Sequence, residues 1–168
     1  MSIRDEGYAR PVSTAQWLVM LHITAAFFYV SGSVAAGILN VLAIRAERPS
    51  ESAYLLRLVR VTLPVIGVGV AGTLVFGLWL WHERGYSFGA AWIWAALVLW
   101  VIAGALGGIG GRHQERSRKL AEQLAASGDT STDELRALLR DSRGNAISWL
   151  AGAATIAILV LMIWKPGS

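Results

Sequence analysis

An uncharged stretch at residues 17–44 limits the fold of this chain more than any other feature. It holds 28 residues without an Asp, Glu, Lys or Arg, and one histidine, His22, lies near its start. About 20 consecutive apolar residues already cross the hydrocarbon core of a bilayer as a helix. A surface helix of a soluble protein would instead carry a polar face along its length. The stretch therefore predicts a transmembrane helix.

Three further apolar segments approach or exceed spanning length, at residues 61–81, 90–111 and 147–164. Helices are expected because the backbone must satisfy its own hydrogen bonds in lipid, and the alternation of a barrel strand is absent. Only 15% of the residues are charged, against roughly 25% in soluble domains. We predict one all-α domain over residues 1–168, a four-transmembrane-helix bundle with spans near 15–45, 58–82, 90–112 and 146–165.

The basic residues predict the orientation of this bundle. Eleven of the 15 Lys and Arg residues fall in the first and third loops, on one side of the membrane. Because Lys and Arg favour cytoplasmic loops, both termini are predicted to lie outside, in the bacterial inner membrane. The same placement in the loops accounts for the net charge of +4, so this charge does not indicate a nucleic-acid partner. We predict that the partner of the chain is the lipid bilayer.

The third loop, residues 113–144, predicts a short cytoplasmic helical hairpin. Good helix formers continue from the third span, and the sequence SGD then breaks the run. Ser131 and Glu134 have the spacing of a capping box before a second short helix. Five leucines would form its apolar side, and we expect the charges to form a solvated face.

Small residues and one proline bear on how the spans pack. Small residues recur at four-residue spacing in all four spans, which lets helix backbones approach closely in lipid. The pairs are Ser33/Gly37, Gly67/Ala71, Gly104/Gly108, Gly107/Gly111 and Ser148/Gly152. We expect them to pack within the bundle, with a homodimer face as the alternative. Pro64 is expected in the first turn of the second span, where proline is tolerated.

The intramembrane polar residues limit the chemistry. No Asp, Glu, Lys or Arg lies inside the apolar segments at residues 17–44, 61–81, 90–111 and 147–164, which argues against a proton-coupled transporter. No serine has a plausible base and orienting group, which argues against a hydrolase. The chain has no cysteine, so disulfides and thiolate metal sites are excluded.

His22 is the main candidate ligand, because imidazole binds haem iron and other metals and a helical bundle is a usual place to hold haem. If the first helix begins near Thr14, His22 lies about 12 Å below the outer end. His82, at the outer end of the second span, is about 8–12 Å away in depth, which disfavours the two as axial ligands of one haem. Met162 could join His22 or His82 around copper. The alternative is that His22 only hydrogen-bonds a neighbouring helix.

Two ordered motifs carry a family resemblance over about residues 15–81. The first is His22-Ile-Thr-Ala25 followed by Tyr29 and Gly32, and the second is RLVR at residues 57–60, then Pro64, then GLWL at 77–80. This pattern resembles four-helix bacterial membrane families, among them copper-resistance D-like proteins, membrane protoporphyrinogen oxidases and predicted integral membrane proteins of unknown function. The resemblance implies that His22 is the first-helix histidine, a haem or metal ligand in some members. It also implies Tyr29 and Gly32 as further cofactor-binding positions.

Three functional hypotheses remain. The leading one is a small membrane protein that binds haem b or a metal through His22, for electron transfer or cofactor handling. The second is a non-catalytic accessory or scaffold subunit, in a homodimer or membrane complex. The third is a copper-handling protein that uses His22, His82 and Met162.

Overall fold

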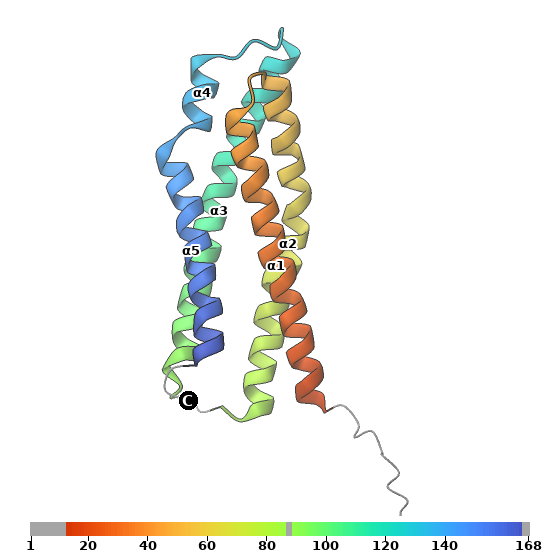
Figure 1. The fold of residues 1–168 in the computed structure, drawn as a ribbon, viewed down its shortest axis with the longest axis vertical. Coiled ribbons are helices and arrows are strands. Elements are labelled where there is room, and N and C mark those ends of the chain that lie inside the picture. Colours follow the sequence, from red (N-terminus) through yellow and green to blue (C-terminus); the bar gives the residue numbers. More distant parts are fainter. Residues whose placement is uncertain (1–12, 87–88, 166–168) are drawn as a thin grey trace, which may run out of the picture.

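Five α-helices make up the computed structural model, which describes residues 13–86 and 89–165 (Figure 1). They are α1 (Thr14–Arg45), α2 (Pro49–Arg84), α3 (Ala91–Ala126), α4 (Asp133–Leu139) and α5 (Ser142–Trp164). The helices α1, α2 and α3, together with α5 and the α4 segment before it, give four candidates long and apolar enough to span a membrane. Within the described residues there is no strand. The predicted all-α class and four-span architecture are confirmed.

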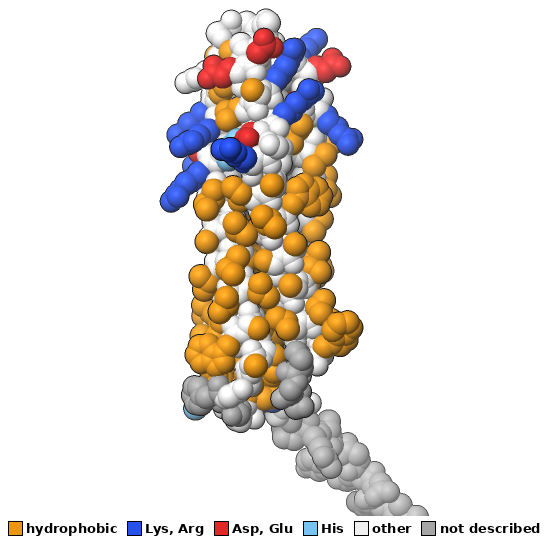
Figure 2. Space-filling model, turned by 90° about the vertical axis from the view of Figure 1, so that its left-hand side faces the viewer, with side chains coloured by type: hydrophobic (Ala, Val, Ile, Leu, Met, Phe, Trp, Pro, Cys, Tyr) orange, Lys and Arg blue, Asp and Glu red, His pale blue; other side chains and the backbone are white. Residues whose placement is uncertain are grey.

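The two ends of the bundle differ in what they carry. The α1–α2 connection and the α4 region lie at one end, and the start of α1, the end of α2, the start of α3 and the end of α5 lie at the other (Figure 1). Lys and Arg side chains gather at the α4 end, above a hydrophobic belt (Figure 2). The chain thus enters α1 and leaves α5 opposite the two arginine-rich connections, as predicted. From the positive-inside rule we predict that the α4 end is cytoplasmic.

The helices associate as two pairs. α1 packs along most of α2, and α3 packs along α5, whereas α1 and α5 meet only briefly. Glycines explain the closeness of the first pair. A Cβ built at Gly69 would overlap the backbone of Tyr29, and one at Gly72 would lie 2.9 Å from Cβ of Ala25. The α1 and α2 backbones therefore touch where these side chains are missing.

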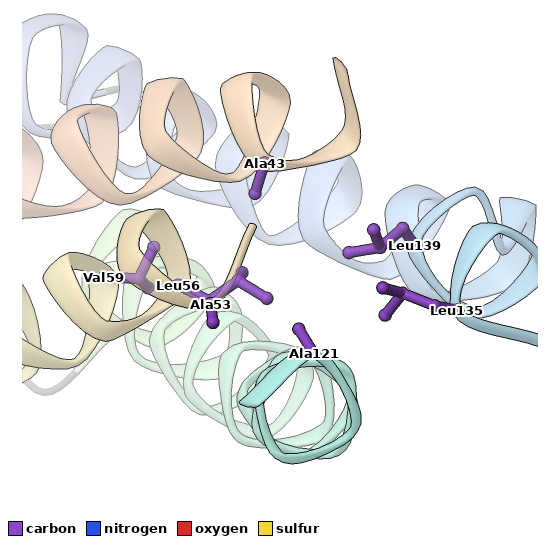
Figure 3. Packing of buried hydrophobic residues seen from close by; sticks show 7 residues of the cluster. All are labelled: Ala43, Ala53, Leu56, Val59, Ala121, Leu135 and Leu139. Atoms are coloured by element: carbon purple, nitrogen blue, oxygen red, sulfur yellow. The ribbon is translucent and has the colours of Figure 1, made fainter. Parts of the chain in front are cut away.

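The largest buried hydrophobic cluster lies at the charged end (Figure 3). It joins residues from the first four helices, which are Ala43, Ala53, Leu56, Val59, Ala121, Leu135 and Leu139. Leu135 is 1% exposed, whereas Trp149 on α5 is 75% exposed. Apolar side chains gain from burial where water is the solvent, but lipid is as apolar as they are. The core therefore forms outside the hydrophobic belt.

The hairpin between the third and fourth spans is present, with a corrected cap. α3 continues unbroken to Ala126, as expected, and α4 follows after a six-residue turn. The N-cap of α4 is Thr132, whose side chain accepts from the Leu135 amide, and not the predicted Ser131. Asp129 in the turn accepts from the amide and hydroxyl of Ser50 at 2.8 and 2.7 Å. The turn thereby caps the start of α2.

Two expectations about packing within the spans were wrong. Pro64 lies in the interior of α2, because this helix begins at Pro49 and not near residue 58. The glycines of the predicted small-residue pairs do not form the close contacts between helices, although Ser148 of one pair lies against Gly110 of α3. Open space surrounds the added Cβ at Gly37, Gly67, Gly104, Gly107, Gly108, Gly111 and Gly152. Other glycines make the close approaches, and the predicted homodimer face stays a prediction.

Candidate functional site

The imidazole of His22 faces α2 and lies inside the α1–α2 pair. A Cβ built at Gly77 would lie 3.0 Å from Cε1 and 3.2 Å from Nδ1 of this ring. The absence of a side chain at Gly77 therefore makes room for the imidazole. Polar groups in membrane spans usually face the interior of the bundle rather than acyl chains, and the His22 ring follows this rule.

The two nitrogens of the His22 ring have different surroundings. Nδ1 is fully enclosed and has no partner in hydrogen-bond geometry. The backbone of Thr73 is the polar group that approaches the ring from α2, outside hydrogen-bond geometry. Nε2, by contrast, is not among the fully enclosed ring atoms without a partner.

The motif that carries the family resemblance forms one face of α1. Residues 22, 25, 29 and 32 are spaced by three, four and three, which places them on one side of a helix. Each lies against a small or apolar residue of α2. His22 faces Gly77, the segment from Ala25 to Tyr29 lies on Gly69 and Gly72, and a Cβ at Gly32 would lie 2.8 Å from Cγ1 of Ile66.

Tyr29 and Gly32 have structural contacts in this face. The Tyr29 hydroxyl lies 2.8 Å from Oγ1 of Thr155 on α5. Oγ1 of Thr155 donates to the Ala151 carbonyl at 3.0 Å, so the Tyr29 hydroxyl is the donor of the shared bond. Gly32 is buried against α2. The cofactor-binding roles implied for both residues stay predictions.

His82 and Met162 are not brought to the His22 ring by any contact that the structure shows. His82 is an exposed residue in the last turn of α2. It follows Gly77 by five residues, which is about 140° around the helix and about 7.5 Å along it. Met162 is half-buried on α5, a helix that barely touches α1. Over residues 13–86 and 89–165, no group of three or more His, Cys, Asp or Glu side chains could hold a metal.

Sequence reasoning missed the α2 side of this site. The relevant residues are Gly69, Gly72 and Gly77, which lie near one face of α2. Gly69 and Gly72 are three residues apart and are neighbours on the helix surface, but the five residues from Gly72 to Gly77 follow no spacing that indicates a shared contact face. The four-residue spacing used for the predictions selects other glycines, including Gly67, which faces open space.

The comparisons with known proteins agree with this architecture. A family model described as "Predicted integral membrane protein (DUF2269)" matches residues 16–166. The chain belongs to this family. No curated protein and no solved structure matches it. Membership in DUF2269 covers all four spans and the hairpin, so the membrane character is a property of the family.

This DUF2269 member has a second polar site, at the charged end of α3. The side chain of Arg118 is 9% exposed and bonds Glu115 at 2.7 Å and Glu122 at 2.8 Å. Arg57 of α2 adds a bond to Glu122 at 3.2 Å. The expectation that the hairpin charges form a solvated face is therefore wrong for Arg118. Its hydrogen bonds hold the pKa of Glu115 below the usual value.

His113 also has a structural contact in the DUF2269 chain. Its Nε2 donates to the Leu138 carbonyl at 2.9 Å, and its Nδ1 lies 4.0 Å from Asp141. A Cβ at Gly144 would lie 2.6 Å from the ring. His113 therefore joins α3 to the end of α4 and the start of α5.

Proposed function

We propose that this membrane protein binds haem b, or another metal group, through Nε2 of His22 and serves electron transfer or cofactor handling. The observation that supports the proposal is the orientation of the ring. Its Nδ1–Cε1 edge lies against Gly77, so α2 covers one side of the imidazole and leaves the other nitrogen for a ligand. When bound, haem would supply one-electron redox chemistry.

If Nε2 binds a ligand, Nδ1 needs a hydrogen-bond partner. Ligating histidines usually donate their second N–H to a carbonyl, carboxylate or water, which fixes the ring and its tautomer. The Thr73 backbone approaches the His22 ring from α2, and its carbonyl is the acceptor that we assign to this N–H. In this arrangement Thr73 orients the ring and Gly77 provides the room for it.

A visible absorption spectrum of the purified, detergent-solubilised protein tests the proposal. We expect a Soret band, either as isolated or after titration with haemin, that His22→Ala abolishes. His82→Ala is the matched control and should keep the band, because His82 is exposed at the end of α2. A monodisperse wild-type protein that neither carries nor takes up haem or a metal in stoichiometric amounts would overturn the proposal.

A scaffold function is the second candidate, and one observation favours it. His22 lies in a continuous close contact between two helices, where it could act by packing alone. In that case the protein would be colourless and metal-free, and it would purify with a membrane partner or as a homodimer. The copper hypothesis with His22, His82 and Met162 predicts stoichiometric copper instead. Elemental analysis of the same sample separates it from the other two.

A further inference from the structure

A cavity of about 550 Å³ lies at the charged end, between the α1–α2 connection and α4. Four of its lining residues are arginines, and one is an acid, Glu47. We call it the arginine cavity, after Arg45, Arg48, Arg136 and Arg140. Its volume falls within the range of small-molecule sites, roughly 300–1,000 Å³.

The positive charge of the arginine cavity is largely uncompensated. Among the described residues, Arg45 and Arg140 have no ion-pair partner, and Arg136 reaches only the exposed Asp133 at 3.9 Å. Arg48 lies near Asp129, whose two carboxylate oxygens already accept from Ser50. The N-terminal end of α2 also opens here and adds the partial positive charge of a long helix.

The base of the cavity is rigid. Pro49, Ser52 and Leu135 are the largest fully buried side chains of the described residues, and all three line the cavity. The hydroxyl of Ser52 donates to the Ala43 carbonyl at 3.1 Å, which ties α2 to α1 beneath the arginines. The four arginines are exposed, and they surround a well-packed floor.

We propose that the arginine cavity binds a phosphate-bearing ligand. Guanidinium groups present a planar fork of donors that matches phosphate oxygens, and such charge-assisted hydrogen bonds are stronger than neutral ones. Arg45 lies in the last turn of α1 and Arg140 directly follows α4, so each arginine also complements a helix C-terminus. Removing either arginine can therefore lower the stability of the fold as well as the affinity for phosphate, and the experiment has to separate these two effects.

The position of the cavity along the helices defines two sources of phosphate. Arg48 lies 12 residues before Arg60, the last charged residue before the apolar part of α2. This is about 18 Å along the helix, beyond a headgroup layer about 5–8 Å thick, where a soluble phosphate compound would bind. α1, however, stays uncharged up to Ile44 in the cavity wall. An anionic lipid headgroup would approach along α1 with the same chemistry.

Calorimetric titration of the full chain in a neutral detergent tests the proposal. The probes are inorganic pyrophosphate and dioctanoyl phosphatidylglycerol, with dioctanoyl phosphatidylcholine as the zwitterionic control. We expect saturable binding of pyrophosphate, of phosphatidylglycerol or of both, which identifies the source, and none of phosphatidylcholine. Arg45→Gln/Arg140→Gln should weaken that binding by about tenfold or more.

Arg112→Gln/Arg116→Gln is the matched control, because it removes the same charge from exposed arginines outside the cavity. It should bind like the wild type. Arg45→Lys/Arg140→Lys keeps the charge and the helix-end complement, and should bind at an intermediate strength because the bidentate fork is lost. Failure of both probes to bind the wild type, or equal weakening in the control pair, would overturn the proposal.

Discussion

The hydroxyl of Tyr29 donates to the hydroxyl of Thr155 across 2.8 Å, and this bond links the α1–α2 pair to the α3–α5 pair. It joins two helices that otherwise meet only briefly. α2 and α3 also connect the two pairs, so the bond adds a polar contact within the hydrophobic belt, where hydrophobic burial gives helices little reason to associate.

Tyr29→Phe tests the strength of this link. We expect the free energy of unfolding to fall by about 0.5–1 kcal/mol, the usual size of a hydrogen bond between membrane helices. A double-mutant cycle with Thr155→Val should show coupling of similar size, measured by denaturation in mixed micelles. Tyr54→Phe is the control, because Tyr54 is 62% exposed. Equal losses for Tyr29→Phe and Tyr54→Phe would contradict the assigned contact.

Gly69→Ala tests the close approach of α1 and α2. The added methyl group would lie 2.8 Å from the Ala25 carbonyl oxygen and overlap the Tyr29 backbone, so one helix must shift. Overpacking of this kind costs about 1–3 kcal/mol. Gly67→Ala is the control two residues away on the same helix, where open space surrounds the added methyl. Thermal denaturation should show a lower Tm for Gly69→Ala and an unchanged or higher Tm for Gly67→Ala.

Arg118→Met tests the buried ion-pair network at the charged end. The hydrogen bond from Arg118 lowers the pKa of Glu115. Burial raises the pKa of Glu122, but the bonds from Arg118 and Arg57 outweigh it and the net direction is downward. Carboxylates with a lowered folded-state pKa stabilise the fold above their unfolded-state pKa, about 4.3 for Glu. This contribution is lost as the pH falls through the lower folded-state pKa.

A series of Tm measurements from pH 7 to pH 3 checks this prediction. The wild type should lose stability on acidification below about pH 5. Arg118→Met should start from a lower Tm at pH 7 and show a smaller further loss. Arg116→Met, at an exposed position of the same helix, should follow the wild-type curve. An acid dependence unaltered by Arg118→Met would show that the network contributes nothing to folding.

The spans and the hairpin were predictable because they depend on local properties. An uncharged run longer than a bilayer is thick indicates a spanning helix whatever its neighbours are. Arginine counts in the loops then placed the start of α1 and the end of α5 at the same end of the bundle. The start of α2 was missed because its first turns, from Pro49 to Arg60, carry charges outside the apolar stretch.

The contacts between helices were not predictable, because helix rotation depends on the partner. Gly67 and Gly69 are two residues apart and chemically identical, yet only Gly69 touches α1. Arg116 and Arg118 likewise lie two residues apart, and only Arg118 is buried. Two such positions are about 200° apart around the helix, so the rotation of the helix relative to its partner decides which of them is buried. The sequence of one helix does not specify that rotation.

The sequence by itself determined that this protein lies in a membrane, how many times it crosses and which end carries the positive charge, since length, hydropathy and loop charge are read along one chain. The tertiary structure alone decided that the ring of His22 turns toward Gly77, that Tyr29 joins α1 to α5 and that four arginines surround a cavity. These features bring together residues distant in sequence, and their geometry exists only once the helices have packed.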